Sequence, residues 1–204
     1  MNKQRNLKKL WFAIAIIPVF LFAGCTDDTA SDDNGYDNGN DAEIQVTYEN
    51  INPITAAEIL AAQTAWGDGL VAISTAYANG EDYGIIAQGV LDDLYGYGYG
   101  PVLFKPTIAQ EVPFRFTEAD AASYFIGGIH TEDGSGFATS PWTAVSFEDD
   151  WEFIINGETA IGMGTVILTD GDGGEVMVQK SMGWFRDTDG SLKIQLHHSS
   201  VPFS

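Results

Sequence analysis

The sequence predicts a single α+β domain in which N-terminal helices pack on one face of a curved antiparallel sheet. Helix-capping signals and apolar residues at helical spacing fill the first half, whereas from Phe137 onward the pattern changes to short runs rich in Val, Ile, Phe, Trp and Met. This order of helices first and strands second is typical of the α+β class. With 45% hydrophobic residues in 204, the chain can bury a core of its own. A sheet curved around helices leaves a conical cavity, which suits a small molecule.

Three helical segments are predicted before the strands begin. Thr55 and Glu58 have capping-box spacing, so the first helix begins after Thr55 and ends at Asn79-Gly80. Its apolar face is marked by residues three, four and seven apart, namely Ile59, Trp66, Leu70, Ile73 and Tyr77. The second helix covers residues 83–94. The third covers residues 117–125, where Thr117 precedes acidic first-turn positions.

The second half of the chain predicts five strands joined by tight turns. They cover residues 143–147, 151–155, 160–168, 176–185 and 192–198. Asn156-Gly157 and the Asp-Gly runs at 170–174 and 187–190 are hairpin signals. A tight turn explains the run at 170–174 better than a calcium loop does. Residues 102–104 form a short apolar run between two prolines.

The N-terminus carries a targeting signal rather than folded structure. Four bases precede an uncharged stretch at residues 10–24, which is shorter than the roughly 20 apolar residues of a membrane-spanning helix. Small residues then precede Cys25, which resembles a bacterial lipoprotein signal whose cysteine is acylated, for example with palmitate. The alternative is a simple N-terminal membrane anchor with an incidental cysteine. We therefore expect a signal peptide at 1–24, an acidic disordered linker at 25–43 and the globular domain at 44–204.

This signal predicts where the protein resides. Acylation at Cys25 would leave it exported and lipid-anchored to the cell envelope. Thr26 follows the cysteine where Asp would favour retention in the inner membrane, so a Gram-negative host would hold it on the outer membrane, facing the periplasm.

Composition excludes several classes of function. Nine Lys and Arg against 29 Asp and Glu give a net charge of −20, which disfavours nucleic acid as a partner. A single Cys excludes an intramolecular disulfide framework and a Cys-rich zinc site. Neither a G-x-S-x-G nucleophile elbow nor a phosphate-binding glycine loop occurs.

Two His and two Ser close the last predicted strand. Strand alternation places His197 and Ser199 on one face and His198 and Ser200 on the other, so the adjacent His residues cannot readily share a metal ion. With His130 as the remaining histidine, a zinc site of the usual ligands is disfavoured. From residue chemistry alone, a structural His pair and a functional one are equally acceptable.

Five strings occur in an order that resembles the iota-class carbonic anhydrases, specifically the branch of cyanobacteria and algae that works without a metal. They are Leu-Phe-Lys-Pro-Thr at 103–107, Phe-Arg-Phe-Thr at 114–117, Ser-Tyr-Phe-Ile-Gly-Gly at 123–128, Gly-Phe-Ala-Thr-Ser-Pro-Trp at 136–142 and His-His-Ser-Ser at 197–200. The resemblance covers residues 56–203. Members are often labelled phosphoribosyl-AMP cyclohydrolase, but that chemistry calls for metal-binding cysteines, which this chain lacks.

The resemblance implies the cone-shaped barrel of a nuclear transport factor 2-like fold, a homodimer, and a cavity that binds carbon dioxide and bicarbonate. It implies catalytic roles for Thr107, Tyr124, His197 and Ser199, with the three hydroxyl residues binding substrate. His198 and Ser200 are the alternative pair, because Ile194 and Leu196 share their face and could equally point into the cavity. A strand bulge would also change which residues face it. No cofactor is expected, with zinc or manganese as the alternative.

These residue types suit carbon dioxide hydration on physical grounds. Histidine titrates near neutral pH and can act as a base, while hydroxyls can donate to a developing carbonate oxygen. Lys105 and Arg115 either admit an anion or are solvated surface groups. The predicted function is reversible hydration by a membrane-tethered, metal-independent enzyme. The alternatives are a small-molecule binding or isomerase lipoprotein on the same fold, and a non-catalytic lipoprotein that interacts through its sheet.

Overall fold

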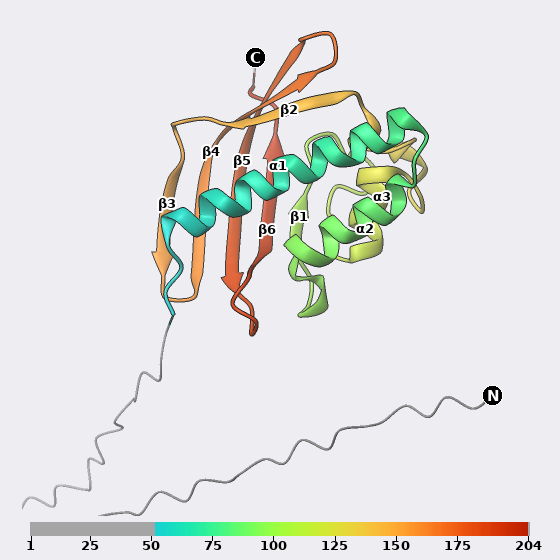
Figure 1. Ribbon diagram of the computed structural model, residues 1–204. Helices are drawn as coiled ribbons and strands as arrows, with labels where there is room; N and C mark the ends of the chain where they lie inside the picture. Colours follow the sequence, from blue (N-terminus) through green and yellow to red (C-terminus); the bar gives the residue numbers. More distant parts are fainter. Residues whose placement is uncertain (1–51, 204) are drawn as a thin grey trace, which may run out of the picture. The chain divides into compact units, whose positions relative to one another are not determined.

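A computed structural model describes residues 52–203, which form three α-helices and a six-stranded sheet (Figure 1). The helices are α1 (Ala56–Asn79), α2 (Tyr83–Leu94) and α3 (Glu118–Ile126). The strands are β1 (Leu103–Lys105), β2 (Trp142–Phe147), β3 (Glu152–Asn156), β4 (Thr159–Asp170), β5 (Glu175–Arg186) and β6 (Leu192–Ser200). Helix α1 runs across one face of the sheet, and α2 and α3 lie beside β1. The predicted α+β class is confirmed. The expected signal peptide, Cys25 and linker lie outside the described residues.

The sheet has the order β1-β6-β5-β4-β2, and β3 pairs with β4. All pairings are antiparallel except that of β1 with β6, which is parallel. The five predicted strands pair antiparallel as expected, and β1, which the sequence marks only as a short apolar run, adds a parallel strand at one edge. Only three residues long, β1 is defined by its pairing, in which Phe104 lies opposite His197. Local sequence carries no signal for a partner more than 90 residues away.

A bulge in β6 sets which side chains face the helices. Gly183 pairs with Leu196 but Trp184 pairs with Ile194, so Gln195 is an extra residue in the ladder. Ile194 and His197 are consequently both buried at 1% exposure, although strict alternation would put them on opposite faces. The bulge therefore turns His197 and Ser199 toward the helices without exposing Ile194.

Helix α1 begins and ends at the predicted residues. The Thr55 hydroxyl accepts from the Glu58 amide, and Gly80 closes the helix at φ 70°, a conformation that favours glycine. Four of the five predicted face residues are buried. Tyr77 is the exception, because its side chain is 41% exposed and packs edge-to-face on Tyr83.

Glu58 also joins the start of α1 to the end of β5. Both of its carboxylate oxygens accept from the Arg186 guanidinium, at 2.8 and 3.0 Å, and these bonds with those from Thr55 lower the pKa of Glu58 to about 2. A depressed carboxyl pKa stabilises the fold above the unfolded value of about 4.3 and loses that effect as the pH falls toward 2. We expect Glu58→Gln to flatten the fall in thermal midpoint between pH 4.5 and 2. An unchanged acid slope would contradict the role of this pair.

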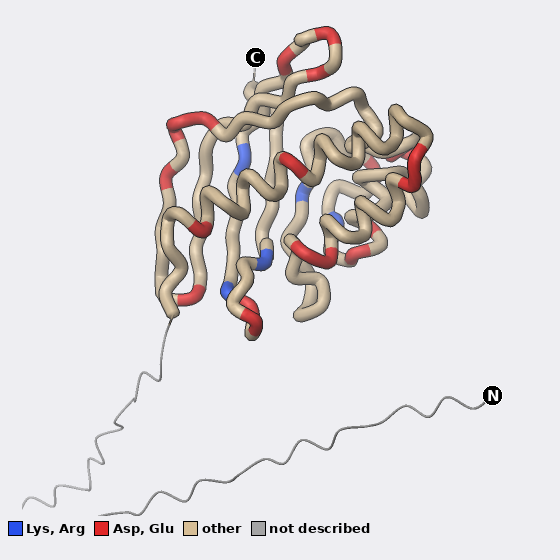
Figure 2. The backbone as a smooth tube through the Cα atoms, in the orientation of Figure 1, with Lys and Arg blue, Asp and Glu red and all other residues tan. Residues whose placement is uncertain are grey.

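Acidic residues outnumber basic ones in the chain. Figure 2 shows Asp and Glu positions mostly on loops and helices, while the few basic positions lie along or beside the sheet. The buried core lies between α1 and the facing sheet, and includes Trp66, Leu70, Val166, Met182 and Trp184. None of the helices between residues 52 and 203 combines the length and apolar character that a membrane crossing requires.

Candidate active site

The four predicted catalytic residues line one small cavity between the helices and the sheet. Thr107, Tyr124, His197 and Ser199 share it with Lys180 and with apolar walls. The walls are Trp66, Phe104, Pro106, Phe125 and Phe137. Its volume of about 10 Å³ is close to the minimum that holds one water molecule. The cavity therefore has room for about one water molecule between these side chains.

Thr107 and Ser199 form a hydroxyl pair on one wall. The Thr107 hydroxyl donates to Ser199 Oγ at 2.7 Å. Parallel pairing of β1 with β6 sets Lys105 opposite His198, which brings the loop after β1 alongside Ser199. The Lys105 ammonium donates to the Ser199 carbonyl at 3.2 Å and so links β1 to the end of β6. The unpredicted parallel strand is thus what places Thr107 in the site.

Tyr124 supplies a phenol without a well-formed hydrogen bond. It lies on α3, is 5% exposed and stacks on Phe137 at 5.4 Å between ring centroids. Within the described chain its buried hydroxyl has no partner at ordinary hydrogen-bond geometry, and weaker contacts with Thr107 and the Ile108 backbone offset part of the effect of burial on its pKa. Burial raises the pKa of Tyr124, so the hydroxyl keeps its proton and can donate. A buried donor without a well-formed hydrogen bond in a cavity indicates a ligand position.

His197 is held at both ring nitrogens. Nδ1 lies 2.9 Å from the Tyr95 hydroxyl and Nε2 lies 2.8 Å from Lys180 Nζ, while Phe104 stacks on the ring at 4.8 Å. The Trp66 indole nitrogen donates to the Tyr95 hydroxyl at 2.9 Å. Burial, with Lys180 beside it, lowers the pKa of His197 well below its usual value. The imidazole is therefore neutral and fixed in orientation.

Three members of this group were not predicted from sequence. Lys180, Tyr95 and Trp66 complete the hydrogen-bonded set around His197. Only Lys180 had a readable signal, because it occupies an inward position between Val178 and Met182 on a strand with a clear period of two. Tyr95 follows α2 in an irregular Gly-Tyr segment, where periodicity gives no orientation.

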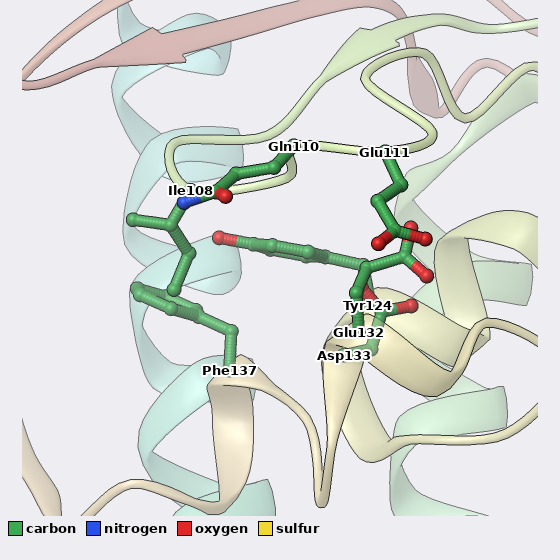
Figure 3. A pocket seen from close by; sticks show the side chains of 7 residues that line it. All are labelled: Ile108, Gln110, Glu111, Tyr124, Glu132, Asp133 and Phe137. Atoms are coloured by element: carbon green, nitrogen blue, oxygen red, sulfur yellow. The ribbon is translucent and has the colours of Figure 1, made fainter.

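A larger outer pocket of about 340 Å³ adjoins the cavity, since Tyr124 and Phe137 line both (Figure 3). Three carboxylates, from Glu111, Glu132 and Asp133, gather at the backbone end of Tyr124. The phenol hydroxyl extends the other way, toward Ile108. Gly136 fixes this wall, because a Cβ there would lie 2.4 Å from the Ile126 backbone. The outer pocket is acidic, whereas the inner cavity contains hydroxyls, an imidazole and an amine.

Arg115 is not a solvated surface group, so that interpretation is wrong, and it lines neither cavity. Its side chain is fully buried, and it donates to Asp133 at 2.7 Å and lies 3.4 Å from Glu132. Asp133 also accepts from the Ser123 hydroxyl at 2.7 Å. Arg115 thereby holds in place the carboxylates that line the outer pocket.

Replacing Arg115 should destabilise the domain strongly. Arg115→Met would leave Asp133, whose side chain is 2% exposed, without its counter-charge, at a cost of about 3–5 kcal/mol. Urea unfolding measures the loss. The double variant Arg115→Met/Asp133→Asn should recover much of it, because no buried charge is left unpaired. A loss below about 1 kcal/mol in the single variant would contradict this role.

The alternative pair lies on the other side of the sheet. His198 is exposed, and with Ser200, Asp150 and Gln179 it lines a separate surface hollow. Neither residue meets Thr107 or Tyr124. Only His197 and Ser199 join them in the cavity.

No group of three His, Cys, Asp or Glu side chains within residues 52–203 is placed to hold a metal ion. His130 pairs with Asp120 at 2.8 Å, apart from the cavity. The donors that meet in the cavity are hydroxyls, an imidazole and an amine rather than a cluster of carboxylates or thiolates.

The fold and the site together define an α+β protein whose helices pack on a six-stranded sheet and enclose a small cavity lined in part by hydroxyl groups. Residues 57–201 match the family described as metal-independent carbonic anhydrase. A relative of that name from Nostoc sp. is 47% identical over 154 residues, which cover 74% of this chain and 75% of the relative. The chain therefore belongs to the metal-independent carbonic anhydrase family, and its enzyme class is carbonic anhydrase.

Solved structures agree with this assignment. The crystal structure of the iota-carbonic anhydrase from a cyanobacterium, complexed with bicarbonate, is similar at a TM-score of 0.71 and 44% identity, over 74% of this chain and 94% of that one. A putative calcium/calmodulin-dependent protein kinase II association domain from Xanthomonas campestris matches at 0.50 and 19% identity, over 73% and 89%, a likeness of fold alone. Family membership also confirms the prediction of a metal-independent enzyme.

Proposed function

We propose that the inner cavity catalyses the reversible hydration of carbon dioxide to bicarbonate. Family membership and the bicarbonate complex of the cyanobacterial relative support this substrate. The observation that carries the proposal is the convergence of three hydroxyls, from Thr107, Tyr124 and Ser199, on one buried cavity, where Tyr124 has no partner at ordinary hydrogen-bond geometry. One small ligand with several acceptor oxygens would satisfy this cavity.

The walls suit a neutral, apolar reactant. Trp66, Phe104 and Phe125 offer carbon dioxide a dry surface, on which it gives up little hydration. As water bonds to the carbon, negative charge grows on the carbonate oxygens. The phenol of Tyr124 can donate to one oxygen and the Thr107–Ser199 pair to another. Fixed donors in a buried site stabilise that charge without reorganising.

The attacking water must also lose a proton. His197 is neutral and lines the cavity, so its ring can take part in that transfer. Because Tyr95 and Lys180 occupy its two nitrogens, accepting a proton requires one of these contacts to rearrange. The carboxylates of the outer pocket lie beyond Tyr124 and can carry the proton toward solvent, while they do not repel an uncharged gas.

Exchange of ¹⁸O between carbon dioxide and water, followed by mass spectrometry on chelator-treated full-length protein, tests the proposal. We expect activity that survives chelation, because the site residues supply the charge stabilisation and proton transfer. Activity lost on chelation and restored by zinc or manganese would replace the mechanism with a metal-dependent one. No activity in either state would favour a binding protein on the same fold.

We also propose that the enzyme is exported and lipid-anchored to the cell envelope through Cys25, on the outer membrane where the host has two. The basic and apolar segments before Cys25 and the acidic stretch after it support this tether. Cys25→Ser should move the protein from the membrane fraction to the soluble fraction of the envelope. A variant that stays in the membrane would favour the simple N-terminal anchor instead.

A homodimer is the assembly we propose, formed through the outer face of the sheet. Ile154, Ile161 and Met163 are 68%, 49% and 63% exposed there, and an apolar hollow of about 380 Å³ lies among them. Contiguous exposed apolar surface of this kind favours burial against a partner. Light scattering should give twice the chain mass, and Ile154→Glu with Ile161→Glu should give a monomer. A monomeric parent protein would contradict the proposal.

A further inference from the structure

Lys180 is a buried lysine for which the steps above give no role. It lies on β5, is 5% exposed, and its Nζ is 2.8 Å from His197 Nε2 and 4.1 Å from the centre of the Trp66 ring. Within residues 52–203 it forms no ion pair with a carboxylate. A buried amine without an acid is costly in its charged form, so its placement in the cavity needs a reason.

The hydrogen bonds that link Trp66, Tyr95, His197 and Lys180 restrict the protonation state of Lys180. The Trp66 indole can only donate, so the Tyr95 oxygen accepts from it and the Tyr95 hydrogen is free to go to His197 Nδ1. A neutral His197 then carries its hydrogen on Nε2, aimed at Lys180 Nζ. The amine can accept that hydrogen only when Lys180 is uncharged. In this form the Trp66, Tyr95 and His197 hydrogens all have acceptors.

Protonating Lys180 forces a different arrangement. The ammonium has no lone pair, so it must donate to Nε2, and His197 must carry its hydrogen on Nδ1. Nδ1–H then points at the Tyr95 oxygen, and the hydrogen of Tyr95 itself loses its acceptor. The charge of Lys180 and the tautomer of His197 are therefore coupled, and two states of the cavity exist, one neutral and one carrying a positive charge.

We propose that Lys180 is a bicarbonate-binding residue of this cavity: its ammonium form holds the anion, and its neutral form leaves the cavity suited to carbon dioxide. The inference rests on the proposed function of the site. Among the residues that line the inner cavity, Lys180 carries the one basic amine. Three carboxylates line the adjoining outer pocket, so an anion in the inner cavity needs a counter-charge there.

The surroundings of Lys180 keep both states accessible. Burial lowers the pKa of Lys180 to about 7, while the face of Trp66 favours the cation. The titratable groups packed around it on the cavity side are Tyr95, Tyr124 and His197. The two tyrosine hydroxyls stay protonated because burial raises the pKa of Tyr95 and of Tyr124. On the outer side of the sheet the charged or titratable neighbours are Lys105, His198 and Asp150, and the Asp150 carboxylate is bonded to Thr165.

Bicarbonate affinity as a function of pH tests the proposal. The ammonium is present below the pKa and is lost as the pH rises through it, so the KM for bicarbonate in dehydration should rise above about pH 7, by about tenfold per unit. Lys180→Met, which keeps the length of the side chain, should bind bicarbonate about 10–100-fold more weakly at pH 6.5 and lose this pH dependence. Its KM for carbon dioxide should change little.

Lys193→Met is the matched control, since Lys193 lies on the same sheet but donates only to the carbonyls of Asp92 and Asp93. It should retain the wild-type profile. An active wild-type enzyme whose bicarbonate KM does not depend on pH, or a Lys180→Met enzyme with unchanged KM, would overturn the role of Lys180 while leaving the proposed function intact. Loss of activity in the wild type would instead overturn the proposed function.

A spectroscopic measurement covers the case in which Lys180→Met does not fold. Nitrogen-15 shifts of the imidazoles in the full-length wild-type chain report tautomers directly, and His130→Gln and His198→Gln identify the His197 signals. We expect hydrogen on Nε2 at pH 8 and on Nδ1 at pH 6, with the ring neutral throughout. An imidazolium at pH 6, or one tautomer at both pH values, would contradict the coupling.

Discussion

Replacing Tyr124 by Phe should lower kcat/KM for carbon dioxide by about 10²–10³-fold without destabilising the domain. The Tyr124 hydroxyl is buried and makes only weak contacts with Thr107 and the Ile108 backbone, so removing it breaks no strong hydrogen bond of the fold. Leaving a buried polar group unsatisfied is itself unfavourable, so the free energy of unfolding should stay the same or rise slightly. Isotope exchange measures the first quantity and urea unfolding the second.

Tyr97→Phe is the matched control and should show the opposite pattern. The Tyr97 hydroxyl donates to the Arg115 carbonyl at 2.9 Å and lies outside the inner cavity. Its loss should cost about 0.5–1.5 kcal/mol of stability and leave turnover near the wild-type value. If Tyr124→Phe keeps full activity, or loses activity only in proportion to stability, then the phenol does not serve as an oxyanion donor.

Thr107→Val and Ser199→Ala should each reduce kcat/KM by about 10²–10³-fold, and the double variant should be little worse than either. The Thr107 hydroxyl donates its hydrogen to Ser199 Oγ at 2.7 Å, which leaves the hydrogen of Ser199 free for a ligand in the cavity. Groups that act as one unit give strongly non-additive losses when they are removed together. A double-mutant cycle measured by isotope exchange quantifies the coupling.

Ser200→Ala is the control for this cycle, because Ser200 lies on the opposite face of the same strand. It should be active at the wild-type level. If the losses of kcat/KM multiply in the Thr107/Ser199 double variant, the two hydroxyls act independently. If Ser200→Ala loses as much activity as Ser199→Ala, the assignment of Ser199 rather than Ser200 to the active site is wrong.

Sequence reasoning was most successful where structure is local. The capping box at Thr55 and the left-handed Gly80 set the ends of α1, and α2 begins and ends at the expected residues. The strands after Phe137 lie within one or two residues of their predicted ends because hairpin turns and period-two patterning are short-range signals. Each of these features depends on residues no more than a few positions apart.

The features that were missed all depend on contacts between distant segments. Parallel pairing of β1 with β6 joins residues more than 90 apart, and it is this pairing that brings Thr107 to Ser199. The bulge at Gln195 arises from the ladder with β5, and it explains why Ile194 and His197 share a face. Arg115 resembled a surface base in the sequence, yet its carboxylate partners lie in a loop that only the fold brings to it.

The candidate site was predictable in part. Thr107, Tyr124, His197 and Ser199 were named through the family resemblance, and the structure brings all four to one cavity. Lys180, Tyr95 and Trp66 were absent from that set, because their role comes from hydrogen bonds around His197 that join α1, the segment after α2 and β5. Residue type and spacing cannot reveal a network that is assembled from three separate elements.

A crystal structure of this protein soaked in bicarbonate, with chelator present, tests the central claim most directly. The account predicts an anion in the inner cavity, within about 3 Å of the Tyr124 hydroxyl and of the Thr107–Ser199 pair, with Lys180 Nζ beside it. An empty cavity at saturating bicarbonate, or an anion bound only on the outer face near His198, would contradict it.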